Sequence, residues 1–357
     1  GDTKSKKERL QHFREWIRNN KLDVVFFNEE HVWPAVALCH EMNVKSGAYI
    51  DYYTKETVPL FGVYDFLICN TRRHYSVFTW HPQTYFIPWG TDLELFRPKN
   101  YGLVEPDALR FFHSAGMNPY RKGTDILLRA FNALRKKHKN ITLVIHTQVP
   151  LEKFFPKLGA MIKHMVREGV LVVREETVPA PGLYHLGAVY VYPTRLDGIG
   201  LSVIEALASG LPVVTSDNGP MNEFVDEKNG RLVRIKRFYQ RYFDHYYWHL
   251  CEVDEESLFR EMEYYIKNKN RIEEFKKDAR VFAEEKLDWN KNAGLIQAAF
   301  TDSSIVRDKT EVLQKIAKFE RMKENKILKA IYKIKILKFD AIRLFWDFIQ
   351  RKMEKVL

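Results

Sequence analysis

Residues 193–217 read Pro-Thr-Arg-Leu-Asp-Gly-Ile-Gly-Leu-Ser-Val-Ile-Glu-Ala-Leu-Ala-Ser-Gly-Leu-Pro-Val-Val-Thr-Ser-Asp. The apolar run at 189–192 just before them predicts a buried strand, and the apolar spacing over 202–209 predicts a helix. The loop that joins the two contains Gly198 and Gly200. A junction of strand, loop and helix start offers backbone N–H groups and the positive end of a helix dipole, which together suit a phosphate group.

Two acidic residues flank this loop, Asp197 on its strand side and Glu205 in the helix. Ser202 and Glu205 also have the spacing of a capping box, in which the glutamate carboxylate merely accepts a hydrogen bond from the backbone N–H of the serine. Glycines likewise serve turns that require a positive φ, with no ligand involved. Spacing alone therefore leaves a ligand site and a local helix cap as open alternatives.

The stretch from Asp197 to Pro212, followed by Glu223 in Gly-Pro-Met-Asn-Glu-Phe-Val, resembles the donor-binding signature of the retaining GT-B glycosyltransferases, family 4 in particular (glycosyl transferases group 1). The resemblance implies that Glu205 holds the ribose of a nucleotide sugar and that Asp197 faces the donor sugar. The family usually has glutamate where Asp197 stands. The shorter side chain keeps the charge and is expected to affect which donor sugar is accepted.

The same resemblance assigns further residues of this junction to the donor. It implies that the backbone of the glycine loop faces the donor diphosphate and that Glu223 supports the loop. The donor-binding residues expected here are Gly198, Ile199, Gly200, Leu201, Glu205 and Glu223.

A second loop, Ser-Ala-Gly-Met-Asn-Pro-Tyr-Arg-Lys-Gly-Thr-Asp at 114–125, follows another predicted strand. It resembles the phosphate loop of the same family, which implies that Gly116 and Lys122 contact the diphosphate. Met117 stands where the family has an arginine, so Arg121 or Arg195 is expected to supply the missing positive charge. The alternative is that the two cations of this loop are a solvated pair near a helix start, where the helix dipole disfavours them.

The N-terminal part alternates predicted helices and strands, at 5–20, 23–27, 32–42, 47–52 and 66–69. This alternation predicts a parallel α/β sheet, and it continues in the second half of the chain with, among other elements, helices expected at 151–167 and 183–186. Asp51 lies at the end of one strand, where many members of the family carry a histidine that faces the donor sugar. The alternative is that Asp51 caps the following turn.

The predicted fold is an α/β fold of the GT-B type, with two Rossmann-like domains that face a cleft and a helical C-terminal tail. The segment 85–98 resembles the exit from the family's N-terminal domain, which implies that the first strands of that domain and their glycine-rich loop have no counterpart here. The expected parts are a partial N-terminal, acceptor-side domain at 1–97, a donor domain at 98–286, a crossover helix at 287–304 and a basic amphipathic tail at 305–357.

The tail carries most of the formal net charge of +11, because Lys and Arg outnumber Asp and Glu by fifteen to seven over 305–357. From 326 onward apolar residues recur at helical spacing among lysines, which predicts an amphipathic helix that binds an anionic membrane surface. A helix packed on the body or on a partner is an equal alternative. Nucleic acid is not an expected partner, because no recognition motif accompanies the charge.

The composition is that of a globular protein, with 357 residues of which 45% are hydrophobic, enough for two domains. Cys39, Cys69 and Cys251 are widely separated and predict neither a disulfide nor a zinc site. The sequence shows no apolar stretch of about 18 residues and no signal-peptide pattern, so we expect a cytoplasmic protein, free or peripheral on the inner face of the membrane. Neither a cofactor nor a metal ion is expected.

Residues 237–249 contain seven aromatic side chains. We expect them to pack in a core or an interface rather than to stack on a base or a sugar ring.

The expected function is that of a retaining glycosyltransferase, which moves a sugar from a nucleotide-diphosphate donor to a glycan or lipid-linked acceptor. Asp197, Asp51 and Lys122 are the expected catalytic residues. The competing hypothesis is a non-catalytic GT-B-like partner or donor-sensing module, motivated by Met117, Asp51 and the partial N-terminal domain. A nucleotide-sugar epimerase is a weaker alternative.

Overall fold

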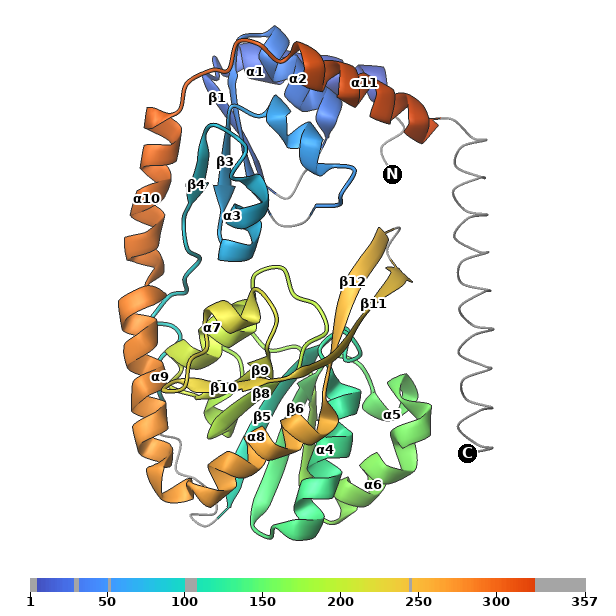
Figure 1. The fold of residues 1–357 in the computed structure, drawn as a ribbon, viewed down its shortest axis with the longest axis vertical. Coiled ribbons are helices and arrows are strands. Elements are labelled where there is room, and N and C mark those ends of the chain that lie inside the picture. The colour runs from blue at the N-terminus through green and yellow to red at the C-terminus, as the bar shows by residue number, and fades with distance from the viewer. Residues whose placement is uncertain (1–4, 29–31, 51–52, 100–107, 244–245, 325–357) are drawn as a thin grey trace. The chain divides into compact units, whose positions relative to one another are not determined.

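The computed structural model describes residues 5–28, 32–50, 53–99, 108–243 and 246–324 (Figure 1). Asp51 and the predicted membrane-binding segment 326–357 lie outside the described residues. The chain divides into two compact units, each built from separate stretches of sequence. The first unit is Gly1–Ala48, Tyr53–Leu67 and Ser303–Leu357, and the second is Tyr49–Tyr52 and Ile68–Asp302. The four domain ranges expected from the sequence stay predictions.

The second unit is built on a six-stranded parallel sheet in the order β10-β9-β8-β5-β6-β7. Its strands are β5 (Leu109–Gly116), β6 (Ile141–Thr147), β7 (Leu171–Glu175), β8 (Val189–Tyr192), β9 (Val213–Ser216) and β10 (Gly230–Val233). The direction of winding changes between β5 and β8, and sheets of this kind bind ligands outside the carboxyl ends of the strands at that point. The two loops singled out in the sequence follow these two strands, and the α/β prediction is confirmed.

The side chains of β8 alternate between two hydrophobic cores. Val189 and Val191 pack with α4 (Thr124–Lys137) and α8 (Glu255–Lys267), whereas Tyr190 and Tyr192 pack with α7 (Leu201–Ala208) and α9 (Ile272–Lys286). Helices on both faces explain why the strand is apolar throughout. The tyrosines lie on the same side of the sheet as α7, which brings their hydroxyl groups toward the loop that precedes this helix.

The helix expected over 151–167 is interrupted. The structure has α5 (Leu151–Phe154), a 3-10 turn at Pro156–Leu158 and α6 (Gly159–Arg167). Pro156 explains the interruption, because proline lacks a backbone N–H and disfavours helical geometry in the residue before it. Here the prediction of one continuous helix was wrong.

An antiparallel hairpin, β11 (Ile235–Phe243) and β12 (Tyr246–Val253), follows β10. Figure 1 shows it extending from the side of the six-stranded sheet where the strands have their carboxyl ends. The aromatic residues of this stretch were expected in a core or interface, yet Phe238 is 65% exposed. A two-stranded ribbon places successive side chains on opposite faces, and one layer of packing cannot cover both.

The first unit contains most of a second, four-stranded sheet, in the order β1-β2-β3-β4. The elements of the N-terminal part are α1 (Lys6–Asn19), β1 (Val24–Asn28), α2 (Trp33–Glu41), β2 (Lys45–Ile50), a 3-10 turn (Val58–Val63), β3 (Phe66–Cys69), α3 (Arg72–Phe78) and β4 (Thr84–Phe86). The helices and strands predicted between residues 5 and 69 are present, with slightly different ends.

A buried ion pair ties the C-terminal part of the chain into the first unit. Lys309 Nζ lies 2.7 Å from Asp65 Oδ1, and both side chains are almost fully buried. Asp65 also accepts hydrogen bonds from the backbone N–H groups of Ser46 and Val306. Several donors around one carboxylate offset its loss of hydration. This contact fixes the start of α11 (Thr310–Glu324), which follows α10 (Trp289–Asp302) in the chain.

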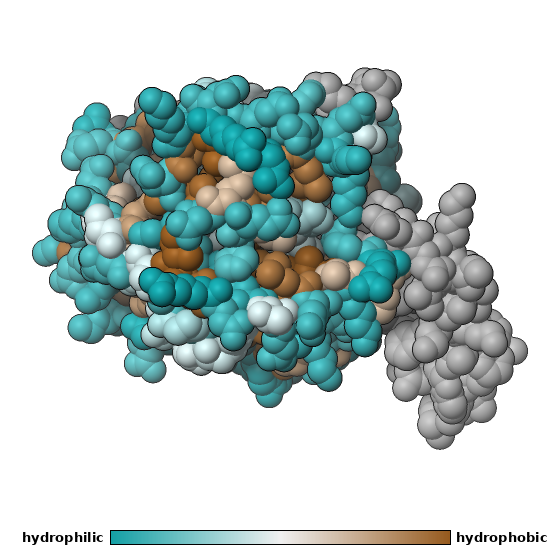
Figure 2. Space-filling view, turned by 90° about the horizontal axis from the view of Figure 1, so that it is seen from above, coloured by the Kyte–Doolittle hydropathy of each residue, from teal (hydrophilic) through white to brown (hydrophobic). Residues whose placement is uncertain are grey.

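A groove of about 700 Å³ lies between α1, α2 and α11. Leu10, Leu38, Leu313 and Ile316 are among the apolar residues that line it. Figure 2 shows hydrophobic surface set among hydrophilic side chains on the face that carries these helices. Among the helices that the structure describes, none combines the length and the apolar character needed to cross a membrane.

Candidate active site

The loops that follow β5 and β8 lie against each other. The backbone N–H of Arg195 donates to the carbonyl oxygen of Arg121 at 2.7 Å, and the Thr194 hydroxyl donates to the same oxygen at 3.1 Å. Gly123 permits this approach, because a Cβ atom at its position would lie 2.0 Å from the carbonyl oxygen of Pro193. The two loops therefore form one site, although they are far apart in the sequence.

Lys122, Asp197 and Tyr192 form a hydrogen-bonded cluster in this site. Lys122 Nζ lies 2.8 Å from Asp197 Oδ2, and the two side chains are 16% and 15% exposed. The Tyr192 hydroxyl donates to the same carboxylate oxygen at 2.5 Å and accepts a hydrogen bond from Lys122. Asp197 Oδ1 accepts the backbone N–H of Gly200 at 3.2 Å. The structure thus brings together two of the three predicted catalytic residues, and the third, Asp51, lies outside the described residues.

Burial and neighbouring charges shift both pKa values in this cluster. Burial lowers the pKa of Lys122, and the Asp197 carboxylate offsets this only in part. For Asp197, burial acts to raise the pKa, but the charge of Lys122 and the hydrogen bonds from Lys122 and Tyr192 outweigh it and lower the pKa. Lys122 and Asp197 therefore form an ion pair that is largely shielded from water.

Glu205 lies one turn into α7 and accepts a hydrogen bond from the Tyr184 hydroxyl at 2.5 Å. The helix begins directly after its N-cap, Gly200, so Ser202 lies within the first turn and no side chain caps the helix. The capping-box alternative is therefore wrong, because it requires serine at the N-cap. Burial raises the pKa of Glu205, and the hydrogen bond from Tyr184 opposes this shift.

The loop before α7 depends on glycine at position 200. Gly200 has a φ of +87°, and a Cβ atom there would lie 2.3 Å from Met221 Cε. Ile199 is buried, Gly198 is half-buried and Leu201 is exposed. Contact of this backbone with a diphosphate stays a prediction.

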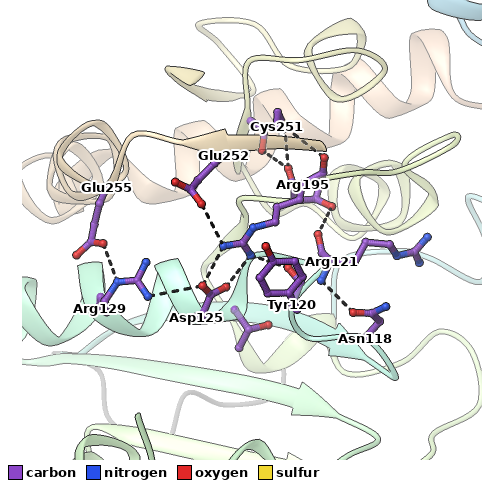
Figure 3. Close-up of polar contacts among 12 residues, drawn as sticks. Asn118, Tyr120, Arg121, Asp125, Arg129, Arg195, Cys251, Glu252 and Glu255 are labelled. Atoms are coloured by element: carbon purple, nitrogen blue, oxygen red, sulfur yellow. Dashed lines mark hydrogen bonds and ion pairs between the residues drawn. The ribbon is translucent and has the colours of Figure 1, made fainter. Parts of the chain in front are cut away.

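Arg195 is not available to a phosphate group. Its side chain is 2% exposed and makes two hydrogen bonds to Asp125, at 2.6 and 2.9 Å (Figure 3). The guanidinium also donates to the Tyr120 carbonyl oxygen and lies 4.1 Å from the centroid of the Tyr120 ring. Burial by itself would lower the pKa of Arg195, but Asp125 raises it above the ordinary value. The hypothesis that Arg195 replaces the arginine missing at position 117 is therefore wrong.

Arg121 is the remaining candidate for the positive charge that the loop lacks at position 117. In Figure 3 its side chain points away from the Asp125–Arg195 pair. It lies near enough to Lys122 to act on it electrostatically, and its Nε is buried without a hydrogen-bond partner in the part of the chain that the structure describes. A guanidinium in this situation can accept an anion as a ligand.

Met117 and Gly116 form the open side of the same loop. Met117 is 74% exposed. Gly116 has a φ of +55°, and a Cβ atom built there meets nothing within 4 Å. This open space leaves room for a ligand, but the donor-binding roles of Gly116 and Arg121 stay predictions.

Glu223 lies in a 3-10 turn after β9 (Met221–Glu223). Its carboxylate accepts the backbone N–H groups of Arg72 and Arg73 at 2.6 and 2.9 Å, at the start of α3. Arg73 in turn donates to the carbonyl oxygen of Gly219 at 2.7 Å. The structure therefore gives Glu223 a helix-capping contact, and its role at the donor stays a prediction.

Several polar groups of the site were not predicted from the sequence. Tyr184 and Tyr192 were counted only as parts of a helix and an apolar strand, although tyrosines at alternate positions of a buried strand carry hydroxyl groups that need partners. His113 was also missed. It is fully buried, bonds to Val191 and Thr124 at 2.8 Å, and burial lowers its pKa to about 4.

The sequence comparisons find similarity to glycosyltransferases. Residues 108–243 match the family described as Glycosyl transferases group 1. The chain is 27% identical over 172 residues to uncharacterized glycosyltransferase 335 of Sulfolobus islandicus rod-shaped virus 1, covering 43% of this chain and 50% of that protein. It is 31% identical over 146 residues to the lipopolysaccharide core biosynthesis mannosyltransferase LpcC of Rhizobium leguminosarum bv. viciae, covering 39% and 42%. The matches span half or less of these relatives.

Solved structures show the same fold. A glycosyltransferase from Rickettsia africae has a TM-score of 0.67 at 14% identity, over 85% of this chain and 84% of that one. The pneumococcal O-GlcNAc transferase GtfA, solved with UDP and GlcNAc, has a TM-score of 0.62 at 16% identity, over 82% and 60%. The fold is therefore GT-B, and residues 108–243 are similar to the glycosyl transferases group 1 family.

Proposed function

We propose that the chain is a glycosyltransferase that moves a sugar from a nucleotide-diphosphate donor to a glycan or lipid-linked acceptor, with retention of the anomeric configuration. The observation that carries this proposal is the cluster of Lys122, Asp197 and Tyr192 beside the start of α7. It places a half-buried cation and backbone N–H groups where doubly wound sheets bind nucleotides.

In this proposal the loops stabilise the departing diphosphate. Lys122, Arg121 and the backbone N–H groups of the glycine loop face the charge that develops as the bond between sugar and phosphate breaks. Fixed donors in a site with little water contribute strongly to catalysis, because they need no reorganisation during the reaction. Asp197 holds Lys122 at 2.8 Å before the donor arrives and then orients the sugar.

Glu205 holds the ribose in the same proposal. A carboxylate accepts hydrogen bonds from two neighbouring hydroxyl groups, which is the geometry that a ribose offers. The hydrogen bond from Tyr184 at 2.5 Å fixes the position of the carboxylate. It also opposes the upward pKa shift due to burial and so favours the ionised form of the carboxylate.

Retention rests on the family resemblance. The acceptor hydroxyl attacks the anomeric carbon on the face from which the diphosphate leaves, and the departing phosphate oxygen takes the hydroxyl proton. The new bond joins the acceptor oxygen to the anomeric carbon, and the bond that breaks joins that carbon to the phosphate oxygen. No protein nucleophile is required in this scheme.

The relatives suggest which donors to test first. Several are named as mannosyltransferases, and three of these are described as GDP-mannose-dependent. Solved structures of the same fold were obtained with UDP and with UDP-glucose. GDP-mannose and UDP-hexoses therefore belong in the first panel of donors.

Calorimetric titration of the chain with nucleotide diphosphates and nucleotide sugars tests the donor site. We expect saturable binding that is lost in Glu205→Ala and in Lys122→Ala. Glu285→Ala, an exposed carboxylate of α9, is the matched control and should bind like the wild type. No binding by the wild type, or equal binding by site and control variants, would overturn the proposal. Proton NMR of the product then reports the anomeric configuration.

A further inference from the structure

Tyr192 contacts both charged groups of the candidate active site. Its hydroxyl donates to Asp197 Oδ2 at 2.5 Å and accepts a hydrogen bond from Lys122. The Lys122 Nζ atom also lies 4.9 Å from the centroid of the Tyr192 ring. One side chain therefore binds both members of the ion pair, the anion as a donor and the cation as an acceptor.

The two side chains that donate to Asp197 Oδ2 differ in their freedom to move. Tyr192 is fully buried at the end of β8, and its carbonyl oxygen accepts the Thr215 hydroxyl of β9 at 2.7 Å. Its ring stacks on that of Tyr190, with 5.6 Å between the centroids. Lysine instead has a flexible four-carbon stem. Lys122 can therefore turn toward a ligand, whereas the Tyr192 hydroxyl stays in place.

The hydrogen bonds of Asp197 show what remains after such a turn. In the part of the chain that the structure describes, its carboxylate accepts hydrogen bonds from Lys122, from Tyr192 and from the backbone N–H of Gly200. Without Lys122, the Gly200 N–H at 3.2 Å and the Tyr192 hydroxyl at 2.5 Å are left. Short hydrogen bonds to a charged acceptor are strong, so Tyr192 is the main remaining partner. A buried carboxylate with too few donors takes up a proton instead.

We propose that Tyr192 is a positioning residue of this site, which holds Asp197 in place and ionised while Lys122 binds the diphosphate. The inference rests on the proposed function, because the ligand that draws Lys122 away is the donor. In this role Tyr192 acts through Asp197. Burial and the charge of Asp197 raise the pKa of Tyr192 well above its ordinary value, so the hydroxyl keeps its proton and remains a donor at neutral pH.

Carbon-13 NMR titration of the Asp197 carboxyl group tests this role without a ligand, because Lys122→Met imitates the departure of the lysine. The wild type, Tyr192→Phe, Lys122→Met and the double variant are compared, and Asp197→Asn identifies the signal. With Lys122 present, its ammonium group compensates for the lost hydroxyl, and Tyr192→Phe should change the pKa of Asp197 little. In the Lys122→Met background the same substitution should raise that pKa, with a gain of about tenfold in proton affinity. Equal pKa values in Lys122→Met and the double variant would overturn the proposal.

Calorimetric titration with GDP-mannose and UDP-glucose tests the same role during donor binding. The diphosphate of these compounds is esterified at both ends and lacks the ionisation that a phosphate monoester has at about pH 6, so a change with pH reports on the protein. At about pH 8, Tyr192→Phe should weaken binding about tenfold relative to the wild type, because Asp197 is left charged and poorly held. At about pH 6 the loss should be smaller, because Asp197 can take up a proton.

Other titratable groups act on this cluster from neighbouring elements. They are the same in Tyr192→Phe and in the wild type, so comparison of the two proteins at each pH cancels their own titration. Among the described residues these groups are Arg121, His113, Tyr190 and Glu205. The matched control is Tyr265→Phe, which removes the hydroxyl of a tyrosine buried in the other hydrophobic core and should bind like the wild type.

A loss of affinity that is equal at both pH values would show that the hydroxyl only supports the packing of the site. That result, or binding by Tyr192→Phe like that of the wild type, would refute the assigned role. No binding of either nucleotide sugar by the wild type would instead count against the proposed function. The NMR series needs no ligand, so it still decides whether Tyr192 holds Asp197 once Lys122 is removed.

Discussion

Replacing Asp197 by asparagine should separate the binding of the diphosphate from the orientation of the sugar. In the free protein Asp197 lies 2.8 Å from Lys122 and therefore competes with a diphosphate for this cation. Asp197→Asn keeps the shape of the side chain and removes the competing charge. We expect the variant to bind a nucleotide diphosphate without its sugar more tightly than the wild type, and to transfer sugar more slowly.

The magnitude follows from the contact that is lost. A hydrogen bond to a charged group contributes about 1.5–3 kcal/mol, and the partial exposure of this pair favours the lower end. About 1.4 kcal/mol corresponds to a factor of ten in Kd, so we expect the Kd of the nucleotide diphosphate to fall about tenfold. The free energy of unfolding should fall by about 1.5 kcal/mol, because Lys122, which is 16% exposed, loses its charged hydrogen-bond partner.

The pH dependence of this effect has a definite sign. Burial already lowers the pKa of Lys122, and loss of the Asp197 carboxylate lowers it further. Lysine is charged below its pKa, so the gain in affinity should be larger at about pH 6 than at about pH 8. Calorimetric titration at both pH values measures the Kd, and urea unfolding measures the stability. Asp278→Asn in α9 is the control. Weaker binding by Asp197→Asn at both pH values would refute the reasoning, because it would show that Asp197 supports the diphosphate site instead of competing with it.

Three further predictions concern other contacts. Tyr184→Phe removes the hydrogen bond that opposes the upward pKa shift of Glu205, so the pKa of Glu205 should rise further. Because we expect the ionised carboxylate to hold the nucleotide, affinity should fall at a higher pH than in the wild type when the pH is lowered from about 8 to about 5 in calorimetric titrations. Lys309→Met leaves Asp65 buried without its ion-pair partner and should lower the free energy of unfolding, measured with urea, by about 3 kcal/mol. Adding Asp65→Asn removes the unpaired charge, so the double variant should recover part of this stability. Deletion of residues 326–357 should abolish binding to anionic vesicles in sedimentation assays and leave nucleotide affinity unchanged, whereas undiminished vesicle binding would contradict a membrane role for this segment.

The elements around the site were predictable because their signals are local. The strand at 189–192, the glycine loop and the helix that follows occupy consecutive residues, and the apolar period changes from one element to the next within this stretch. Helix α4 likewise buries Ile126, Leu127 and Phe131, which share one face at helical spacing. Patterns of this kind need no knowledge of the rest of the chain.

The partners of the charged side chains were not predictable, because they come from distant parts of the sequence. Arg195 pairs with Asp125, and Glu205 accepts a hydrogen bond from Tyr184, and no spacing rule connects either pair. The hairpin was also missed. The residues between its strands, Asp244 and His245, are not one of the glycine-containing pairs that indicate a tight hairpin turn.

The pairing of charges at the site has a consequence for how a diphosphate can bind. Asp125 neutralises Arg195, and Asp197 neutralises Lys122, so these two cations add no net charge to the empty site. Arg121 adds one positive charge, and Glu205, whose carboxylate acts on Lys122, adds one negative charge. The site therefore does not attract a diphosphate by a local excess of positive charge. To bind the diphosphate, one of these cations has to leave its carboxylate partner. Lys122 can do so more easily, because it is 16% exposed, whereas Arg195 is 2% exposed and makes two hydrogen bonds to Asp125. In the proposed function, transfer of Lys122 from Asp197 to the diphosphate would leave the carboxylate beside the sugar, so that binding of the donor itself would bring Asp197 into its orienting role.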